Sequence, residues 1–200
     1  MARFTTTGKA LHDLALGLSV FAGTDNSLPA FTHVQLELSG THVVGRATDR
    51  YRALIGTVQA REDVEGEFVA LVSAKWLLSA GKSVKACAHV TVELSEPESG
   101  LRFVTVTGDG QTFTTQPYDA QFPGIEKLFD TFKPAETDSV AFNPAFMADI
   151  AKIPAKLHGG KSAGVAPLKL TLCGERKPAL FTIESADVTW RGLLMPVILH

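Results

Sequence analysis

The sequence has little of several things that would assign it quickly to a class. Its 200 residues include only two cysteines, Cys87 and Cys173, each within an apolar run. Packing in a reducing cytosol explains them better than a disulfide or a metal site. No apolar run approaches the ~20 residues of a membrane span, and the N-terminus lacks the basic stretch and apolar core of a signal peptide. We therefore expect a cytoplasmic protein.

The motifs of common enzymes are also missing. The triplet GKS occurs at 81–83 and 160–162, but Trp76 and Ala155 occupy the positions where a phosphate-binding loop needs glycine. The six histidines show no zinc-ligand spacing, and no Gly-x-Ser-x-Gly elbow or helical carboxylate pair is present. The sequence predicts a protein that is not an enzyme and needs no metal or cofactor.

What the chain does contain is a repeat. Three stretches, 4–22, 68–86 and 139–153, each read as a short β-like run, a small capping residue and a helix. Ser73 is a natural N-cap, and Asn143 followed by Pro144 is a typical helix start. Three strand-like runs follow each helix. The pattern predicts an α+β fold of three β-α-β-β-β units, with antiparallel sheets, helices on one face and a linker at 119–138.

The expected helices separate apolar from basic side chains. At about 100° per residue, Trp76, Leu77, Ala80 and Val84 share one arc of the second helix, and lysines share the opposite arc. The first helix is weaker, with Leu11, Leu14 and Leu18 in line and His12 and Asp13 on the far side. The third carries the stripe Phe146, Ile150 and Ile153.

Six of the eleven lysines fall in 73–85 and 143–161, although the net charge of the chain is −2. Such faces are either merely solvated or suited to contact with phosphates that is not sequence-specific. Two of them in an acidic chain favour nucleic acid modestly. The candidate residues that would face a nucleic acid are Lys9, Lys75, Lys82, Lys85, Lys152, Lys156 and Lys161.

One segment is unusually charged for a strand. RATDRYR, residues 46–52, carries four charges between the apolar pairs Val43-Val44 and Leu54-Ile55. Taken alone, it reads as a solvated strand edge. Together with QFPGIEKLF (121–129) and the terminal LLMPVIL (193–199), it resembles the bacterial β sliding clamp, the processivity factor of DNA polymerase III. The three patches occur here in the order that the family has, and the loop 22–38 is similar to a segment of the same domain.

The resemblance implies a domain organisation. Residues 1–118 resemble the middle domain of the clamp, built of two units, and 119–138 the linker after it. Residues 139–200 resemble only the second half of the last domain. The first domain and half of the third are expected to be absent, as in a reduced-size clamp, which a viral genome would suit.

The resemblance also implies a binding site. In the family, the ATD strand, the linker segment and the C-terminal tail converge on an apolar groove that binds peptide tails of polymerases, clamp loaders and repair proteins. The charges at 46–52 would then frame this groove and stabilise its turn. On residue type alone, 195–197 could equally be a last core strand. The residues carried over to the groove are Thr48, Arg52, Pro123, Leu128, Leu193, Met195, Pro196 and Val197, with Lys127 near the rim.

Some residues depart from the family pattern. Ala53 stands where many members have leucine, and Ile198 where they have arginine, so the preferred partners can differ. The resemblance therefore implies a DNA sliding clamp that encircles duplex DNA as a homo-oligomer. In the family a ring is built from twelve such units, so three units per chain imply four chains. The alternative is a clamp relative that does not encircle DNA but binds the same peptides and competes with a host clamp.

Overall fold

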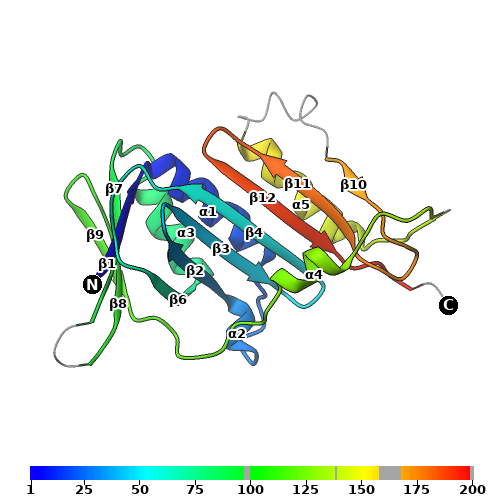
Figure 1. Cartoon of the computed structure of the whole chain (residues 1–200), viewed down its shortest axis with the longest axis horizontal. Coiled ribbons are helices and arrows are strands. Elements are labelled where there is room, and N and C mark those ends of the chain that lie inside the picture. Colours follow the sequence, from blue (N-terminus) through cyan, green and yellow to red (C-terminus); the bar gives the residue numbers. More distant parts are fainter. Residues whose placement is uncertain (97–99, 138, 158–167, 199–200) are drawn as a thin grey trace.

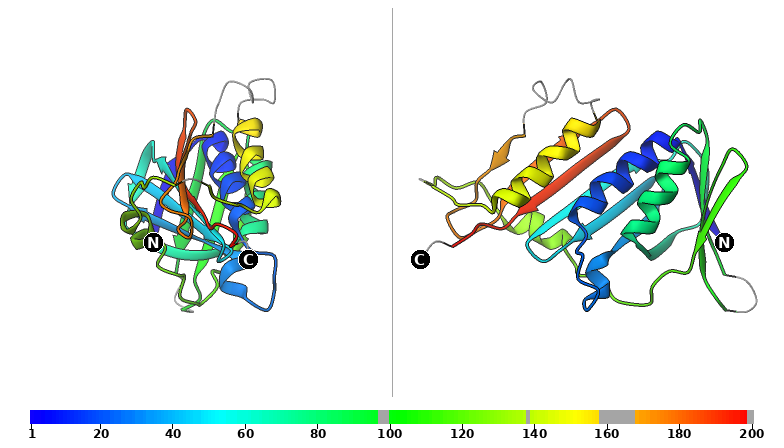
Figure 2. Two further views of the ribbon diagram at one scale, coloured as in Figure 1. Left: turned by 90° about the vertical axis from the view of Figure 1, so that its right-hand side faces the viewer. Right: turned by 180° about the vertical axis from the view of Figure 1, so that it is seen from behind.

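The computed structural model describes residues 1–96, 100–137, 139–157 and 168–198. Two antiparallel sheets hold most of the chain, and three long helices lie side by side on one face of the larger sheet (Figures 1 and 2). This is the α+β fold with helices on one face that the repeat predicts. Within the described residues, no helix is both long and apolar enough to cross a membrane.

The first unit contains β1 (Ala2–Thr6), α1 (Gly8–Phe21), β2 (His33–Ser39), β3 (His42–Thr48) and β4 (Arg52–Gln59). Thr7 caps α1, since its side chain accepts a hydrogen bond from the amide of Ala10 at 3.1 Å. A short helix, α2 (Pro29–Thr32), lies in the loop before β2 and was not expected from the sequence.

The second unit contains β6 (Phe68–Ser73), α3 (Ala74–Ser83), β7 (Val90–Ser95), β8 (Phe103–Gly108) and β9 (Gln111–Thr115). An additional strand, β5 (Glu62–Glu65), connects the two units. The third unit contains α5 (Pro144–Leu157), β10 (Leu170–Thr171), β11 (Ala179–Glu184) and β12 (Val188–Leu194). The predicted cap holds, because Asn143 Oδ1 accepts from the amide of Ala145 at 2.9 Å. Helix α4 (Glu126–Thr131) lies between the second and third units.

The first two units exchange their first strands. β1 pairs with β7 of the second unit, and β6 pairs with β2 of the first. The five-stranded sheet therefore runs β5-β1-β7-β8-β9, and the seven-stranded sheet runs β10-β11-β12-β4-β3-β2-β6. The two units are interlocked, because each contributes a strand to the sheet of the other.

The third unit joins the first through a strand ladder. β12 pairs antiparallel with β4 over seven residue pairs, from Val188↔Val58 to Leu194↔Arg52. One continuous sheet thus passes from the first unit to the third, although 128 residues separate these two strands along the chain. Helices α1, α3 and α5 cover the same face of this sheet, which we call the helix face; α4 lies on the opposite, outer face (Figure 2).

The main core lies between the helix face and α1. It includes Leu14, Leu18, Leu54 and Trp190, all at most 1% exposed. Gly56 of β4 is needed there, because a Cβ at this position would come within 2.6 Å of Leu14 Cδ1 and 2.9 Å of the Trp190 ring. The absence of this Cβ lets the helix and the indole both pack on the strand.

One prediction for α1 was wrong. The sequence placed His12 and Asp13 on an outward face, but both are buried, as are most residues of the helix. The reason is that α1 lies between α3 and α5, so its flanks are covered as well as the side that faces the sheet. The faces of α3 and α5 agree better with prediction: Leu77, Ala80, Ile150 and Ile153 are buried.

Candidate functional site

The charged segment 46–52 forms a tight turn between β3 and β4. Thr48 donates its hydroxyl to the carbonyl of Arg52 at 2.8 Å and accepts from the amide of Arg50 at 3.2 Å. Asp49 accepts from the amides of Tyr51 and Arg52 at 3.0 and 2.9 Å. Arg50 adopts a left-handed backbone, with φ of 81°. The polar side chains of the turn therefore satisfy its backbone, which explains their presence in an otherwise apolar hairpin.

Arg52 points from this turn to the helix face. Its guanidinium is 2.8 Å from Asp49 and 3.3 Å from Asp149 of α5, and it lies 4.4 Å from the centre of the Phe146 ring. The side chain is buried. Lys152 also donates to Asp149 at 2.8 Å, and this hydrogen bond, with the two nearby cations, holds the pKa of that carboxyl below its usual value. Arg52 therefore ties the first unit to the third.

Arg46 points to the outer face. It is two residues from Thr48 on the same strand, and its buried guanidinium pairs with Glu37 of β2 at 2.7 Å and with Glu126 of α4. A single arginine therefore bridges the sheet and the helix that crosses it. Arg46 and Arg52 thus act on opposite faces, in agreement with the two-residue period of a strand.

A second apolar cluster lies on the outer face, beneath the segment 122–129. It contains Phe122, Ile125 and Phe129 from this segment, packed on Ala53 and Ile55 of β4, and also includes Leu71 and Leu193. Arg191 of β12 lies over the Phe129 ring, 5.4 Å from its centre. The segment between the second and third units is therefore packed against the sheet rather than extended in solvent.

The proposed groove residues fall into three groups around this cluster. Thr48, Ala53 and Leu193 form a row across three neighbouring strands, since Thr48 pairs with Ala53 and Ala53 with Leu193. Pro123 and Leu128 belong to the segment that crosses this face. Met195, Pro196 and Val197 follow directly on β12, beside the turn, with the amide of Met195 donating to the carbonyl of Tyr51 at 2.8 Å.

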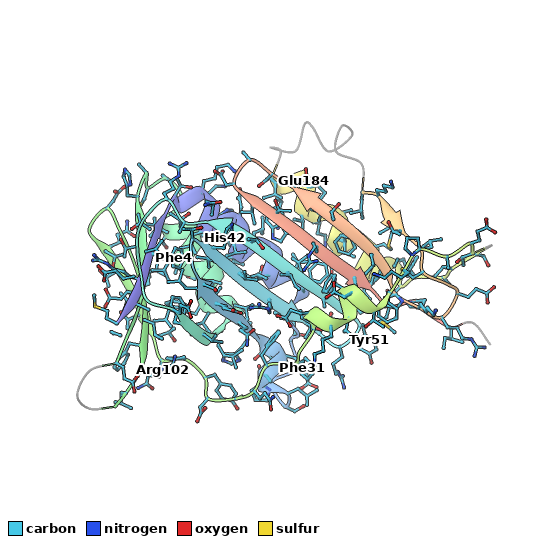
Figure 3. The ribbon with its side chains drawn as sticks, in the orientation of Figure 1. Phe4, Phe31, His42, Tyr51, Arg102 and Glu184 are labelled. Atoms are coloured by element: carbon cyan, nitrogen blue, oxygen red, sulfur yellow. The ribbon has the colours of Figure 1, made fainter. Side chains whose placement is uncertain are left out.

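Exposed apolar side chains gather at this end of the sheet. Tyr51 is 53% exposed, Leu128 40%, Met195 37% and Val197 43%. Tyr51 lies at the α4 end of the sheet (Figure 3), and its ring is 6.0 Å from that of Phe146. The tail at 195–197 is therefore not a last core strand, because β12 ends at Leu194 and two of the three side chains of the tail are exposed. Arg52 differs from the other candidates, since its side chain lies on the helix face.

The candidate lysines of α3 and α5 point outward. Lys75, Lys82, Lys85, Lys152 and Lys156 are all exposed. Lys152 shares Asp149 with Arg52. Lys161 lies outside the described residues.

Lys9 is exposed but locally neutralised. Its ammonium is 2.6 Å from Asp13 and 3.4 Å from Asp187. The hydrogen bond to Asp13 raises the pKa of Lys9, against an opposing effect of burial. Burial raises the pKa of Asp13, but hydrogen bonds from His12 and Lys9 outweigh it and hold this pKa below its usual value. The described residues contain no group of three or more His, Cys, Asp or Glu side chains that could hold a metal ion.

The sequence and the structure are both similar to those of known proteins. Residues 7–124 match the family described as "DNA polymerase III beta subunit, central domain". The match covers more than half of the chain and includes both the turn at 46–52 and the start of the segment 122–129 that crosses the outer face. The chain belongs to the DNA polymerase III beta subunit family. The resemblance seen in three short patches is thus confirmed over a much longer stretch.

Two members of the beta subunit family show how far the likeness extends. The chain is 31% identical over 138 residues to the beta sliding clamp of Streptomyces coelicolor and 26% identical over 133 residues to that of Micrococcus luteus. These matches span 36% and 42% of the two proteins, so the chain corresponds to less than half of either.

Solved structures of beta subunits share the fold over the whole chain. The DNA polymerase sliding clamp from Bacillus subtilis superimposes with a TM-score of 0.74 at 13% identity, covering 100% of this chain and 65% of that one. The DNA polymerase III beta subunit from Thermotoga maritima gives 0.74 at 15% identity, covering 100% and 66%. At such identities the likeness concerns the fold, including the third unit, which lies outside the matched family region.

Sequence reasoning missed several residues that shape this region. Phe122, Ile125 and Phe129 anchor the crossing segment, and their spacing of three and four residues is the signal of an amphipathic turn. Arg46 was recognised only as one of several charges. Its pairing with Glu126 joins positions 80 residues apart, and no local pattern reveals such a pair.

Proposed function

We propose that the chain is a sliding clamp, which encircles duplex DNA as a homo-oligomer and binds peptides of polymerases and clamp loaders at its outer face. The observation that carries this proposal is the continuous seven-stranded sheet, with α1, α3 and α5 all on one face of it. A sheet with helices along one face can form part of a wall around a rod such as duplex DNA. In this proposal the protein binds DNA and client peptides in the cytoplasm, where bacterial replication takes place, and catalyses no reaction.

The helix face is the surface proposed to meet DNA. Exposed lysines on α3 and α5 suit sliding, because contacts with phosphates hold the duplex without reading its sequence. Lys9 contributes less positive charge than its exposure implies, since two carboxylates surround it. We therefore expect Lys75, Lys82, Lys85 and Lys156 to carry most of the attraction.

The ring is proposed to contain four chains. The relatives span more than twice the matched length, and two open sheet edges are available for association: β9 ends one sheet and β10 ends the other. In this proposal 1–118 corresponds to the middle domain of a clamp, 119–138 to its linker and 139–200 to half of the last domain.

The client site is proposed at the α4 end of the outer face. The supporting observation is the exposed apolar group formed by Tyr51, Leu128, Met195 and Val197 beside the row Thr48–Ala53–Leu193. An extended peptide with apolar side chains would be held between the crossing segment and the tail. Met195 suits varied partners, because its thioether side chain is flexible. Arg52 acts beneath the site, where it fixes the turn.

Peptide binding tests the client site. A fluorescently labelled peptide copied from the C-terminal tail of a bacterial replicative polymerase is titrated with the protein, and its anisotropy is measured. Leu128→Glu is expected to weaken peptide binding at least tenfold. Leu128 is 40% exposed, and a carboxylate at this position would either lose its water when the peptide binds or keep the peptide away. The matched control is Leu101→Glu, a leucine of similar exposure (51%) in the second unit. Equal effects of the two substitutions would contradict the assignment.

Charge reversal tests the DNA face. Lys75→Glu combined with Lys82→Glu is expected to weaken binding to duplex DNA and to flatten its dependence on salt, because fewer counterions are released. Lys127→Glu and Lys177→Glu, away from the helix face, serve as the control with the same change in net charge. If the control pair weakens DNA binding as much, then the helix face is not the contact surface.

A further inference from the structure

The third unit has a helix followed by three strands, like the other two units, but the described part of the chain holds no second unit with which it could exchange its first strand. In the first two units, the strand after the helix takes the first strand of the other unit: β2 takes β6, and β7 takes β1. In the third unit this position belongs to β10. β10 pairs with β11 and is the last strand of the sheet, so within the described residues its other edge carries no strand.

The segment 139–142 already has half of the surroundings of β1. In the first unit, Thr5 accepts a hydrogen bond from the amide of Arg61, at 2.9 Å, from the chain that follows β4. In the third unit, Ala141 accepts from the amide of Val197, at 2.7 Å, from the chain that follows β12. Thr5 and Ala141 both stand three residues before the first helical residue of their unit. The two segments therefore occupy equivalent positions. β1 has a strand, β7, on its other side, whereas the part of the chain that the structure describes places no strand on the other side of 139–142.

The helices show the same relation. α1 and α3 cross near the eighth residue of each helix, Ala15 and Gly81. A Cβ built on Gly81 would lie 3.1 Å from His12 Cα, one turn before Ala15, and 3.5 Å from Ala15 Cβ. The eighth residue of α5 is Ala151, which is exposed. A helix position that faces water can hold a side chain of any size, whereas a position where two helices cross closely requires a small residue.

The flank of α5 that carries Ala151 is apolar. Asp149 lies on the α1 side of α5, since it pairs with Arg52, whose guanidinium is 5.3 Å from the ring centre of Phe21, the last residue of α1. At about 100° per residue, the opposite flank then carries Met147, Ala151 and Pro154. Met147 is half-buried and Pro154 buried, and no charged residue stands among the three. This flank is the one that would face a further helix.

We propose that the third unit pairs with the third unit of a second copy of this chain about a twofold axis. Residues 139–142 of each copy would lie beside β10 of the other, and the two α5 helices would cross at Ala151, as α1 and α3 cross within the chain. A second copy is the fitting partner because the exchange inside the chain is reciprocal, and the third unit offers both the donated segment and the receiving edge. The pairing deepens the four-chain ring of the proposed function but requires neither DNA nor a client peptide.

Disulfide formation tests this crossing directly. The 3.5 Å separation of the Cβ positions in the α1–α3 crossing lies in the range of Cβ separations in disulfides. Ala151→Cys is therefore expected to give a covalent dimer under mild oxidation, seen on a non-reducing gel. The matched control is Ala148→Cys, an exposed alanine on the solvent side of the same helix, expected to stay monomeric on the gel. The native cysteines, Cys87 and Cys173, are buried. A failure of Ala151→Cys to cross-link, or equal cross-linking of the control, would overturn the proposal.

Light scattering gives the second test. The wild-type protein is expected to have two or four times the mass of one chain, and Ala151→Arg to halve this mass, whereas Ala148→Arg leaves it unchanged. Circular dichroism on each variant checks that the fold is retained. A wild-type monomer at micromolar concentration, or an oligomer that Ala151→Arg does not affect, would overturn the pairing. Cross-linking at 151 without retention on DNA would leave the pairing intact and refute the clamp function instead.

Discussion

Replacing Arg52 by methionine should be the most destabilising single change in the turn at 46–52. The side chain is 6% exposed and makes ion pairs with Asp49 at 2.8 Å and Asp149 at 3.3 Å, and it stacks on Phe146. Removing one member of a buried ion pair costs about 3–5 kcal/mol. Here Asp49 keeps two backbone donors and Asp149 keeps Lys152. We therefore expect a loss of about 3 kcal/mol, including ~1 kcal/mol from the aromatic contacts.

The assay is thermal unfolding followed by circular dichroism. For a chain of this length, ~3 kcal/mol corresponds to a fall in Tm of roughly 6–12 °C. Arg61→Met is the control, because Arg61 is an exposed arginine at which a substitution should change stability by no more than about 0.5 kcal/mol. A loss below ~1 kcal/mol for Arg52→Met would refute the reasoning, since it would class this buried bridge with ordinary surface ion pairs.

Two further changes test other parts of the structure. Arg46→Met should loosen the contact of α4 with the sheet, because Glu126 and Glu37 lose their shared partner. Hydrogen exchange of the amides in 122–131 should then become faster, while exchange in α1 stays the same. Unchanged exchange in 122–131 would contradict this role of Arg46. Asp13→Asn should cost about 1–3 kcal/mol at pH 7, since it removes charge-assisted hydrogen bonds to a buried carboxylate. The pKa of Asp13 is lowered on folding, so its contribution is present above the unfolded value of about 4 and is lost as pH falls through the folded value. The free energy of unfolding, measured at pH 7 and pH 3, should differ less between the variant and the wild type at pH 3. A difference that stays constant would argue against a charged Asp13 as the source of the stability.

Local sequence pattern predicted the elements better than their partners. Helix starts were readable because Ser73 and Asn143 are capping residues, and the lysine faces of α3 and α5 were readable because their apolar stripes are clear. The exchange of β1 and β6 between units was not predictable in this way, since a strand with one apolar face fits any complementary edge. The same limit explains His12 and Asp13, because helices from elsewhere in the chain cover the flanks of α1. The backbone of His12 lies against Gly81 of α3, and α5 packs on the other side of α1.

The candidate site shows a similar division. The resemblance identified the segments that meet at the α4 end of the sheet, and the structure brings Met195 to within a backbone hydrogen bond of Tyr51, next to the turn. It did not indicate on which face each side chain lies. Arg52 belongs to the helix face because the strand alternates, while Phe122 and Phe129 hold the crossing segment through contacts with strands far away in sequence. Such contacts follow from the three-dimensional path of the chain.

Retention on DNA of different topology tests the central claim, encirclement, most directly. Chains are assembled in the presence of a nicked circular plasmid or of the same plasmid after linearisation, and gel filtration at moderate salt then measures how much protein co-elutes with the DNA. We expect the protein to be retained on the circle and lost from the linear form, because a ring that holds DNA by enclosing it can leave only over an end. Equal retention on both templates, or none on either, would contradict it.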